Sequence, residues 1–315
     1  WFLGSADAIY QNLHIVHDEK PEYIFVFGAD HIYRIDPRQM LDHHIESGAA
    51  VTVAGIRVDR ATCDQFGIIT PGQGNRIASF QEKPAVEDTV GLPDAPDQVL
   101  ASMGNYVFTA DALEEIVKED AEDDDSRHDI GGNLIPALVA KGDAAVYDFT
   151  TNVVPGEEDK PHYWRDVGTI DTYHEAHMDL VAQGPAFDLY NREWPIYTKE
   201  RSLPPAKLVL GSEGHRADVK MSLMGNGVIV SGGIVSGSVM SPGVRIDDGA
   251  VVENSVLLDD VHVARGAVVR GAVLDKNVHV PPGATIGVDN ASDAKHYTIS
   301  PGGVVVLAKD QEVIA

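Results

Sequence analysis

The hydrophobic pattern of the chain changes near residue 185. Before this point, short apolar runs alternate with segments in which apolar residues recur at helical spacing, which is typical of an α/β domain with a largely parallel sheet. After it, short aliphatic and glycine units follow one another with hardly any helical periodicity. We therefore expect a domain at residues 1–184, a linker at 185–207 and a second domain at 208–315.

The first half predicts individual helices and strands. Residues 23–27, YIFVF, are continuously apolar and predict a strand that is buried on both faces. Ser5 is expected to cap a first helix that carries Ile9, Leu13 and Val16 on one face. Further strands are expected at 50–58, 76–80, 104–108 and 144–149, and helices at 37–46, 110–118 and 171–181.

The second half contains a repeat. VRIDDGAVVENSVLLDD at 244–260 and VHVARGAVVRGAVLDKN at 261–277 precede a third copy that begins VHVPPGATIG at Val278, so the period is 17 residues. Within each copy, small aliphatic residues recur at steps of six, six and five, which predicts three faces per turn. One such unit cannot bury its apolar side chains alone, so successive copies must stack. The repeat therefore predicts a parallel β-helix.

Charge and composition narrow the function classes. The chain has 24 Lys and Arg residues against 49 Asp and Glu residues, and its net charge of −25 repels a phosphate backbone. No apolar run approaches the roughly 20 residues of a membrane helix, and the N-terminus has neither a basic leader nor a small-residue cleavage site. We expect no nucleic acid partner, no membrane location and no export.

Two other features are expected to carry no chemistry. Cys63 is the only cysteine, which excludes an internal disulfide and a cysteine-ligated zinc and fits a reducing cytoplasm. The acidic run EDAEDDDSRHD at 119–129 lacks the glycine and the terminal glutamate of a calcium loop. It predicts a solvated loop.

Two aspartates are candidate metal ligands. Asp30 follows the apolar strand at 23–27, and ligands bind outside the carboxyl ends of strands in open α/β sheets. Asp166 lies in YWRDVGT, before a Gly-Thr pair that can open a helix. Two carboxylates from distant segments can share one magnesium ion, with substrate phosphates completing its shell. Spacing alone leaves two alternatives open: Asp30 as a turn cap, and Asp166 as a helix cap or a partner of Arg165.

Two short motifs carry weaker signals. Glu82-Lys83-Pro84 follows the expected strand at 76–80 and offers an ammonium group that can bind a phosphate. Ser102, in SMGNY, combines a hydroxyl with a glycine at a strand entry and can hydrogen bond a sugar.

His174 and His177 stand at helical spacing without an apparent third metal ligand, so both are expected on the surface. GxSxG, GxxxxGK[ST], GxGxxG and HExxH motifs do not occur.

Five segments agree in order and spacing with a known family. Together with the β-helix they resemble the ADP-glucose pyrophosphorylases, and the resemblance covers nearly the whole chain. The segments are WFLGSADA at 1–8, FGADHIY at 27–33, FQEKP at 80–84, ASMGNYVF at 101–108 and YWRDVGT at 163–169.

The resemblance implies a fold and a reaction. It implies an α/β, Rossmann-like (GT-A type) nucleotidyltransferase domain followed by a left-handed parallel β-helix of hexapeptide repeats. It also implies that ATP and glucose 1-phosphate are joined into ADP-glucose with release of pyrophosphate, for glycogen synthesis. The sugar phosphate oxygen is the attacking group, so the absence of a catalytic triad is expected.

The resemblance also implies the site residues. Catalytic Mg²⁺ is expected on Asp30 and Asp166. Phe2 stands where family members often carry tyrosine, which puts a hydroxyl contact there in question. Glucose 1-phosphate is expected to contact Phe2, Gly67, Glu82, Lys83 and Ser102, and the nucleotide to lie near Gly4 and Ser5.

Two family features bear on activity and regulation. The glycine-rich GGxGxRL phosphate-binding segment of the family does not occur, and the chain begins at Trp1. Because that segment supplies amides and a basic side chain to the triphosphate, we expect the 315 residues alone to have little or no activity and to fold poorly. Family members are usually homotetramers regulated by metabolites such as fructose 1,6-bisphosphate, AMP or phosphate. Arg270 lies near one of their basic effector positions.

Three other interpretations stay open. The first is a related pyrophosphorylase with another nucleotide or sugar, such as UDP-N-acetylglucosamine or GDP-mannose. The second is a hexapeptide acyltransferase that uses His262 or His279, although their spacing of one coil fits a repeated surface position better. The third is a non-catalytic regulatory subunit, against which the presence of Asp30, Lys83 and Asp166 argues.

Overall fold

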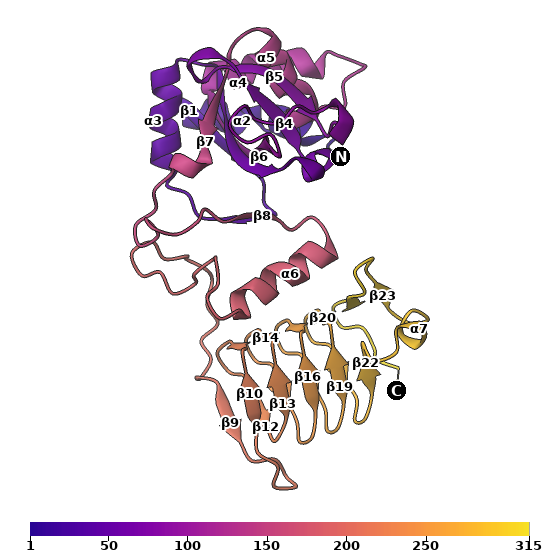
Figure 1. The fold of residues 1–315 in the computed structure, drawn as a ribbon. Helices are drawn as coiled ribbons and strands as arrows, with labels where there is room; N and C mark the ends of the chain where they lie inside the picture. The colour runs from indigo at the N-terminus through magenta and orange to yellow at the C-terminus, as the bar shows by residue number, and fades with distance from the viewer. Residues whose placement is uncertain (315) are drawn as a thin grey trace. The chain divides into compact units, whose positions relative to one another are not determined.

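A computed structural model describes residues 1–314, and its contacts divide the chain into two compact units. Unit 1 contains residues 1–29 and 34–154, and unit 2 contains residues 30–33 together with the chain from Pro155 onward (Figure 1). The predicted limits at 1–184, 185–207 and 208–315 mark changes in the sequence pattern. The contacts that define the two units do not test them, so they stay a prediction. No helix among residues 1–314 is long and apolar enough to cross a membrane.

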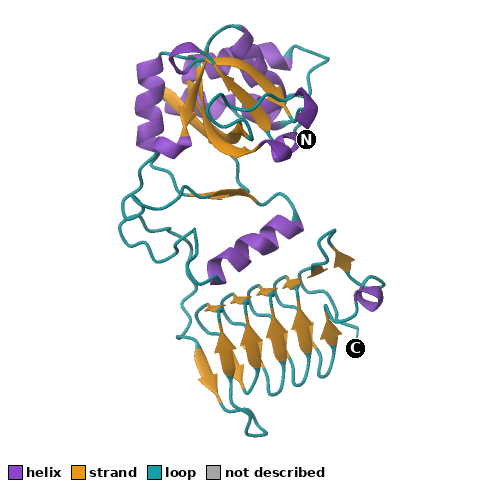
Figure 2. Cartoon of the chain, viewed as in Figure 1, coloured by secondary structure: helices purple, strands orange, loops and turns teal. Residues whose placement is uncertain are grey.

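Unit 1 contains a six-stranded sheet with helices on both faces (Figure 2). The strand order is β5-β4-β6-β3-β7, and β1 pairs with β6. The strands are β1 Tyr23–Phe27, β3 Val51–Asp59, β4 Gly67–Pro71, β5 Ile77–Glu82, β6 Gln98–Thr109 and β7 Ala144–Asp148. The α-helices are α1 Ser5–Gln11, α2 Leu13–Glu19, α3 Pro37–Ser47, α4 Ala110–Ala121 and α5 Ile135–Ala140. Shorter helical turns are η1 Arg60–Gln65, η2 Gln73–Asn75, η3 Val86–Asp88, the π-turn η4 Ile130–Leu134 and η5 Phe149–Thr151.

The sheet of unit 1 is mixed, so the expectation of a largely parallel sheet is wrong. β6 is antiparallel to β1, β3 and β4, and β4 is antiparallel to β5. Within the described sheet only β3 and β7 run parallel. For β4 and β5 the physical reason lies in their connection, a short turn rather than a crossover helix, which permits only antiparallel pairing.

The strand at 23–27 forms as predicted, but it is not buried on both faces. Ile24 and Val26 pack against the core, whereas Phe25 and Phe27 are 37% and 39% exposed. Within the described chain β1 pairs with β6 alone, so it is an edge strand, and only the face that carries Ile24 and Val26 packs against the core. The first helix also differs, because it breaks at Asn12 and its N-cap residue is Gly4 rather than Ser5.

The core of unit 1 lies between one sheet face and four helices. Side chains of α1, α2, α4 and α5 pack there against alternate residues of the strands. On the opposite face α3 packs against β3 and β7. There the buried ring of His44 contacts Thr52 Oγ1 at 2.9 Å and Thr109 Oγ1 at 3.2 Å. Cys63 is free and buried.

Unit 2 begins with a two-stranded ribbon and a helix. The strands β2, His31–Tyr33, and β8, Trp164–Asp166, are antiparallel. They are followed by α6, Ile170–Val181, which begins close to the predicted position. A long irregular stretch then leads into stacked coils.

The coils form a parallel β-helix with three sheets (Figure 1). The first sheet contains β9 Lys207–Val209, β12 Ile229–Ser231, β15 Arg245–Ile246, β18 His262–Val263 and β21 His279–Val280. The second contains β10 Asp218–Lys220, β13 Ile234–Ser236, β16 Val251–Glu253, β19 Val268–Arg270 and β22 Thr285–Ile286. The third contains β11 Leu223–Met224, β14 Val239–Met240, β17 Val256–Leu257, β20 Ala272–Leu274, β24 Val305–Leu307 and the antiparallel β23 Thr298–Ile299.

The registers confirm the predicted period of the β-helix. Arg245 pairs with His262 and His262 with His279, each one coil apart. On two of the three faces the predicted aliphatic residues are buried inside the coils: Val244, Ala250, Val261, Ala267, Val278 and Ala284. On the third face the prediction is wrong, because Val256 and Val273 pack outside against α6 while the next residues, Leu257 and Leu274, point inward. After β22 the repeat is interrupted by a segment that contains α7, Asn290–Asp293, and β23, before β24 resumes the third sheet.

Candidate active site

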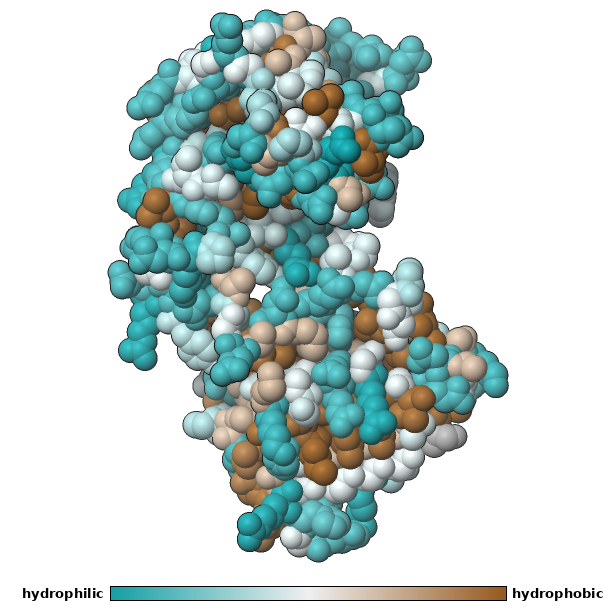
Figure 3. Space-filling model, viewed as in Figure 1, coloured by the Kyte–Doolittle hydropathy of each residue, from teal (hydrophilic) through white to brown (hydrophobic). Residues whose placement is uncertain are grey.

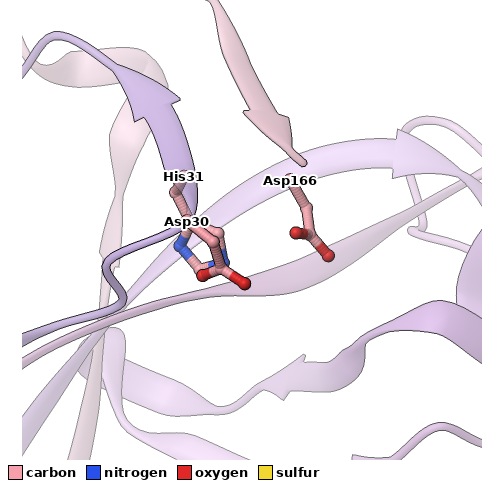
Figure 4. A group of neighbouring side chains, drawn as sticks. All are labelled: Asp30, His31 and Asp166. Atoms are coloured by element: carbon pink, nitrogen blue, oxygen red, sulfur yellow. The ribbon is translucent and has the colours of Figure 1, made fainter. Parts of the chain in front are cut away.

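Asp30 and Asp166 meet on the ribbon of unit 2, together with His31 (Figure 4). The pairing of β2 with β8 places His31 opposite Asp166. The backbone N–H of Val167 donates to the carbonyl of Asp30 at 3.1 Å, which closes the end of the ribbon. One ligand atom from each of the three side chains lies within 4.8 Å of the others.

The two carboxylates are only partly neutralised by their surroundings. The N–H of Gly168 donates to Asp166 Oδ1 at 2.8 Å and orients that carboxylate. The Asp30 side chain is 60% exposed, and within residues 1–314 only His31 Nε2, at 3.6 Å, lies within ion-pair distance of it. Neighbouring Arg165 binds Glu175 and Asp179 instead. Two nearby carboxylates without a guanidinium or ammonium partner repel each other, and oxygen donors of this kind suit a hard divalent cation.

His31 is a member of this cluster that the sequence interpretation missed. Its ring lies 5.3 Å from the ring of Trp164, and its Nδ1 atom is buried without a hydrogen-bond partner. The only signal in the sequence was its position next to Asp30. Because β2 is short and its partner strand is more than 130 residues away, that signal was too weak to use.

A second group of predicted residues lies in unit 1, where β4 pairs with β5. Gly67 is opposite Glu82 in this pairing. A Cβ atom on Gly67 would lie 2.4 Å from Phe80 Cζ and 2.9 Å from Glu82 Oε2, so a larger residue would displace both side chains. Lys83 has a left-handed backbone with φ of 47°, and it is exposed and forms no ion pair within the described chain. The pairing thus holds a carboxylate beside an available ammonium group.

Glu82 belongs to a polar cluster around Gly131. A Cβ atom on Gly131 would lie 3.3 Å from Glu82 Oε2, 3.5 Å from Asp129 Oδ1 and 3.7 Å from the Tyr106 hydroxyl. Gly131 is part of the π-turn η4, and such turns are frequent at functional sites. Ser102 and Tyr106 both project from β6. We name Glu82, Ser102, Tyr106 and Asp129 the polar cluster of unit 1.

The environment raises the pKa of two members of this cluster. Partial burial is the main cause that raises the pKa of Glu82; Lys83 opposes the change and Asp129 adds to it. Burial raises the pKa of Tyr106 to about 12, although its hydrogen bond with Ser102 counteracts the effect. Tyr106 therefore remains a neutral hydroxyl at physiological pH. The sequence interpretation missed Tyr106 and Asp129, because a tyrosine in a strand and an acid in an acidic run carry no distinct signal.

The N-terminal residues dock onto the segment before η4. A Cβ atom on Gly4 would lie 2.2 Å from the carbonyl oxygen of His128, so glycine is required for this contact. Ser5 Oγ donates to Asp129 Oδ2 and accepts from the N–H of Ile130, both at 2.9 Å. Phe2 is 52% exposed. The Ser5 hydroxyl is therefore engaged in holding this segment.

The acidic run at 119–129 is only partly the solvated loop that was predicted. Asp123, Asp124 and Asp125 are exposed, as expected. Asp120 instead accepts hydrogen bonds from Ser126 Oγ at 2.6 Å and from His128 Nδ1 at 2.8 Å, and its side chain is largely buried. The prediction is wrong at this end of the run, because α4 extends into it and packs on the sheet.

The remaining candidates lie in unit 2 away from the carboxylate pair. Arg270, on β19, is half exposed, and its Nε atom lies 2.6 Å from Glu253 Oε2. His262 contacts Asp247 Oδ2 at 2.7 Å, and it pairs with His279 one coil on, their tilted rings 4.7 Å apart, which confirms the repeated position. His174 and His177 are partly buried on α6 rather than free on the surface.

Comparison with known proteins agrees with both folds. The family model described as nucleotidyl transferase matches residues 2–183, and the model described as GlmU-like, C-terminal hexapeptide matches residues 204–307. The first match defines the class of protein, a nucleotidyltransferase that carries a left-handed β-helix. Enzymes of this kind use a divalent metal, which the carboxylate pair fits.

Curated relatives narrow the class further. The glucose-1-phosphate adenylyltransferase of Acidothermus cellulolyticus is 59% identical over 99% of this chain and 76% of its own length. Those of Streptomyces coelicolor and Corynebacterium kroppenstedtii are 59% and 57% identical over 99% of this chain, and over 77% and 75% of their own lengths. The chain belongs to the glucose-1-phosphate adenylyltransferase family.

Proposed function

We propose that the protein transfers the adenylyl group of ATP to glucose 1-phosphate, giving ADP-glucose and pyrophosphate. The observation that carries this proposal is the meeting of Asp30 and Asp166 on one ribbon. The similarity to the glucose-1-phosphate adenylyltransferases of Acidothermus cellulolyticus and Streptomyces coelicolor supports the choice of reaction. The protein is an enzyme that uses no residue of its own as a nucleophile.

Asp30 and Asp166 hold Mg²⁺ in this proposal. Both offer carboxylate oxygens, which are the donors that Mg²⁺ prefers, and the exposure of Asp30 leaves room for water and phosphate oxygens. When bound, the ion neutralises charge on the phosphates of the substrates. The N–H of Gly168 orients Asp166, and the imidazole of His31 supports Asp30.

Glucose 1-phosphate binds at the polar cluster of unit 1 and Lys83. The carboxylate of Glu82 and the hydroxyls of Ser102 and Tyr106 provide acceptors and donors for sugar hydroxyls. Lys83 provides a point charge for the phosphate, and Gly67 keeps space open beside Glu82. A phosphate oxygen of the sugar attacks the α-phosphorus of ATP as the bond to pyrophosphate breaks, so positioning and charge neutralisation suffice.

Gly4 and Ser5 act on the nucleotide side through the backbone. Because the Ser5 hydroxyl is engaged with Asp129 and Ile130, we assign it the role of holding the 127–130 segment rather than a direct phosphate contact. Phe2 offers only an aromatic surface to the sugar phosphate.

Assembly, regulation and location complete the proposal. Aliphatic side chains lie exposed on the β-helix (Figure 3), among them Leu208, Val209 and Ile234, and exposed apolar surface of this kind supports subunit contacts in a homotetramer. Arg270 is our candidate for binding an anionic effector. A single, buried, free thiol supports a cytoplasmic location.

Substitution of the carboxylate pair tests the proposal. In the full-length protein, with any residues that precede Trp1, Asp30→Asn and Asp166→Asn should each lower kcat by at least about 100-fold, because a bound metal contributes several kcal/mol. Exposed Asp18, on α2, offers the matched control Asp18→Asn, which should retain full turnover. Unchanged turnover of either ligand variant would contradict the assigned role.

A further inference from the structure

The helix α6 begins directly after the proposed metal ligand Asp166. Only Val167, Gly168 and Thr169 separate Asp166 from the first helical residue, Ile170. Thr169 and Thr172 cap the start of the helix reciprocally, which fixes the path of this short connection. The position of Asp166 therefore depends on where α6 begins.

Asp171, in the first turn of α6, is bound by the segment that interrupts the β-helix repeat. Its carboxylate accepts hydrogen bonds from Ser300 Oγ and, at 3.0 Å, from the N–H of Gly302. A Cβ atom on Gly302 would lie 2.6 Å from Asp171 Oδ1, so glycine leaves the space that the carboxylate occupies. Ser300 is itself buried, and its Oγ also accepts from the N–H of Val304 at 2.9 Å.

The rest of α6 also contacts the β-helix. His174 Nε2 donates to the carbonyl of Asn254 at 2.7 Å. The apolar side chains on the same stripe of the helix pack against the third sheet. These are Ile170, Tyr173 and Met178 against Val256, Val273 and Val304.

The interrupting segment has no counterpart in the preceding coil. There β19 and β20 are separated by Gly271 alone, whereas β22 and β24 are separated by residues 287–304. Stacking of coils does not require these extra residues, because the third sheet continues directly from β20 to β24. The extra residues do make one contact that no repeated coil makes, the hydrogen bonds of Ser300 and Gly302 with Asp171.

We propose that Asp171, bound by Ser300 and Gly302, is a positioning residue that sets Asp166 for metal binding. The proposal rests on the metal site of the proposed function. The β-helix then serves catalysis directly, because it holds the helix that follows a metal ligand. A change in the 300–302 segment alters metal affinity without touching the metal.

Metal binding measured without substrate tests this role. Mn²⁺ alone is titrated into the full-length protein, and free Mn²⁺ is followed by electron paramagnetic resonance. Asp171→Ala and Ser300→Ala should each weaken Mn²⁺ binding about 10-fold, the usual effect of losing a residue that orients a ligand. In turnover assays the half-saturating Mg²⁺ concentration should rise by a similar factor, and kcat should recover at high Mg²⁺.

A matched control separates positioning from general loosening of unit 2. Arg201 Nη1 binds Asp260 Oδ2 at 2.7 Å, and so joins another segment to the β-helix without contacting Asp171 or Ser300. Arg201→Ala should bind Mn²⁺ within about twofold of the parent, since the effect of a positioning residue is local. If Asp171→Ala fails to fold by circular dichroism, Ser300→Ala, which removes one hydroxyl, provides the test.

Two contrary results can be told apart. Folded Asp171→Ala and Ser300→Ala variants that bind Mn²⁺ like the parent, while Asp166→Asn does not bind it, would overturn the positioning role alone. Undiminished Mn²⁺ binding by Asp166→Asn would overturn the metal site, and the positioning role with it.

Discussion

Asp166 lies opposite His31 in the antiparallel pairing of β8 with β2, and His31 is the neighbour of Asp30. The short ribbon thus brings together two aspartates that are 136 positions apart in the sequence. By its contacts the ribbon belongs to unit 2, which also contains α6 and the β-helix.

Lys83 should control affinity for the sugar phosphate. It is exposed and forms no ion pair within residues 1–314, so its ammonium group is available to an anion. Lys83→Ala should raise KM for glucose 1-phosphate by roughly 10-fold or more, because a hydrogen bond to a charged group contributes about 1.5–3 kcal/mol. KM for ATP should change much less. Lys141→Ala, at an ammonium bound to Glu119, is the control and should leave both constants unchanged.

A side chain at Gly67 should cost both stability and affinity for the sugar phosphate. The Cβ atom of Gly67→Ala would lie 2.4 Å from Phe80 Cζ, which must move together with the nearby Glu82 carboxylate. We expect a loss of about 1–3 kcal/mol in the free energy of unfolding, measured in urea, from overpacking. KM for glucose 1-phosphate should rise as well. Gly142→Asn, at a site with positive φ and nothing within 4 Å of the added Cβ atom, should leave that KM unchanged.

The Tyr106 hydroxyl should act as a hydrogen-bond donor throughout the working pH range. Burial raises its pKa to about 12, so it stays protonated well above neutral pH. Tyr106→Phe should raise KM for glucose 1-phosphate about 3- to 10-fold, which corresponds to the free energy lost with one neutral hydrogen bond. Tyr197→Phe, at a residue that is 90% exposed, serves as the control. An unchanged KM in Tyr106→Phe would remove this hydroxyl from the sugar site.

Unit 1 should lose stability in mild acid through His44. Burial lowers the pKa of His44, so the unfolded chain binds its proton more readily than the folded chain. Stability is then full above about pH 6.5, the ordinary pKa of histidine, and declines as the pH falls below it. Urea unfolding between pH 7.5 and about pH 5 measures the decline. His44→Gln should reduce its slope, and an equal slope in parent and variant would contradict this assignment.

Much of the fold could be predicted from local sequence. The helices α3, α4 and α6 and the strands β3, β6 and β7 formed near the expected residues, because each carries the apolar periodicity of its own structure. The β-helix could be predicted best, since its register is the period of the repeat itself. Strand order could not be predicted, because the antiparallel pairings of β6 are formed by residues far apart in the chain.

The candidate site could be predicted only in part, because it too depends on contacts between residues far apart in the chain. Asp30 and Asp166 were expected to share an ion, and the ribbon brings them together. His31, Tyr106 and Asp129 were missed, because their position depends on the β2–β8 pairing and on the π-turn η4 rather than on any motif. The contact of Asp171 with Ser300 was equally invisible, since the partner lies in the segment that breaks the repeat.

The most direct test of the account is product formation with different nucleotides. The full-length protein is supplied with glucose 1-phosphate, Mg²⁺ and, in turn, ATP, UTP, GTP or dTTP, and pyrophosphate release is measured together with the mass of the sugar nucleotide. Adenylyl transfer predicts ADP-glucose from ATP and far slower release with the other three nucleotides. A clear preference for another nucleotide, or no release with any of them, would contradict adenylyl transfer.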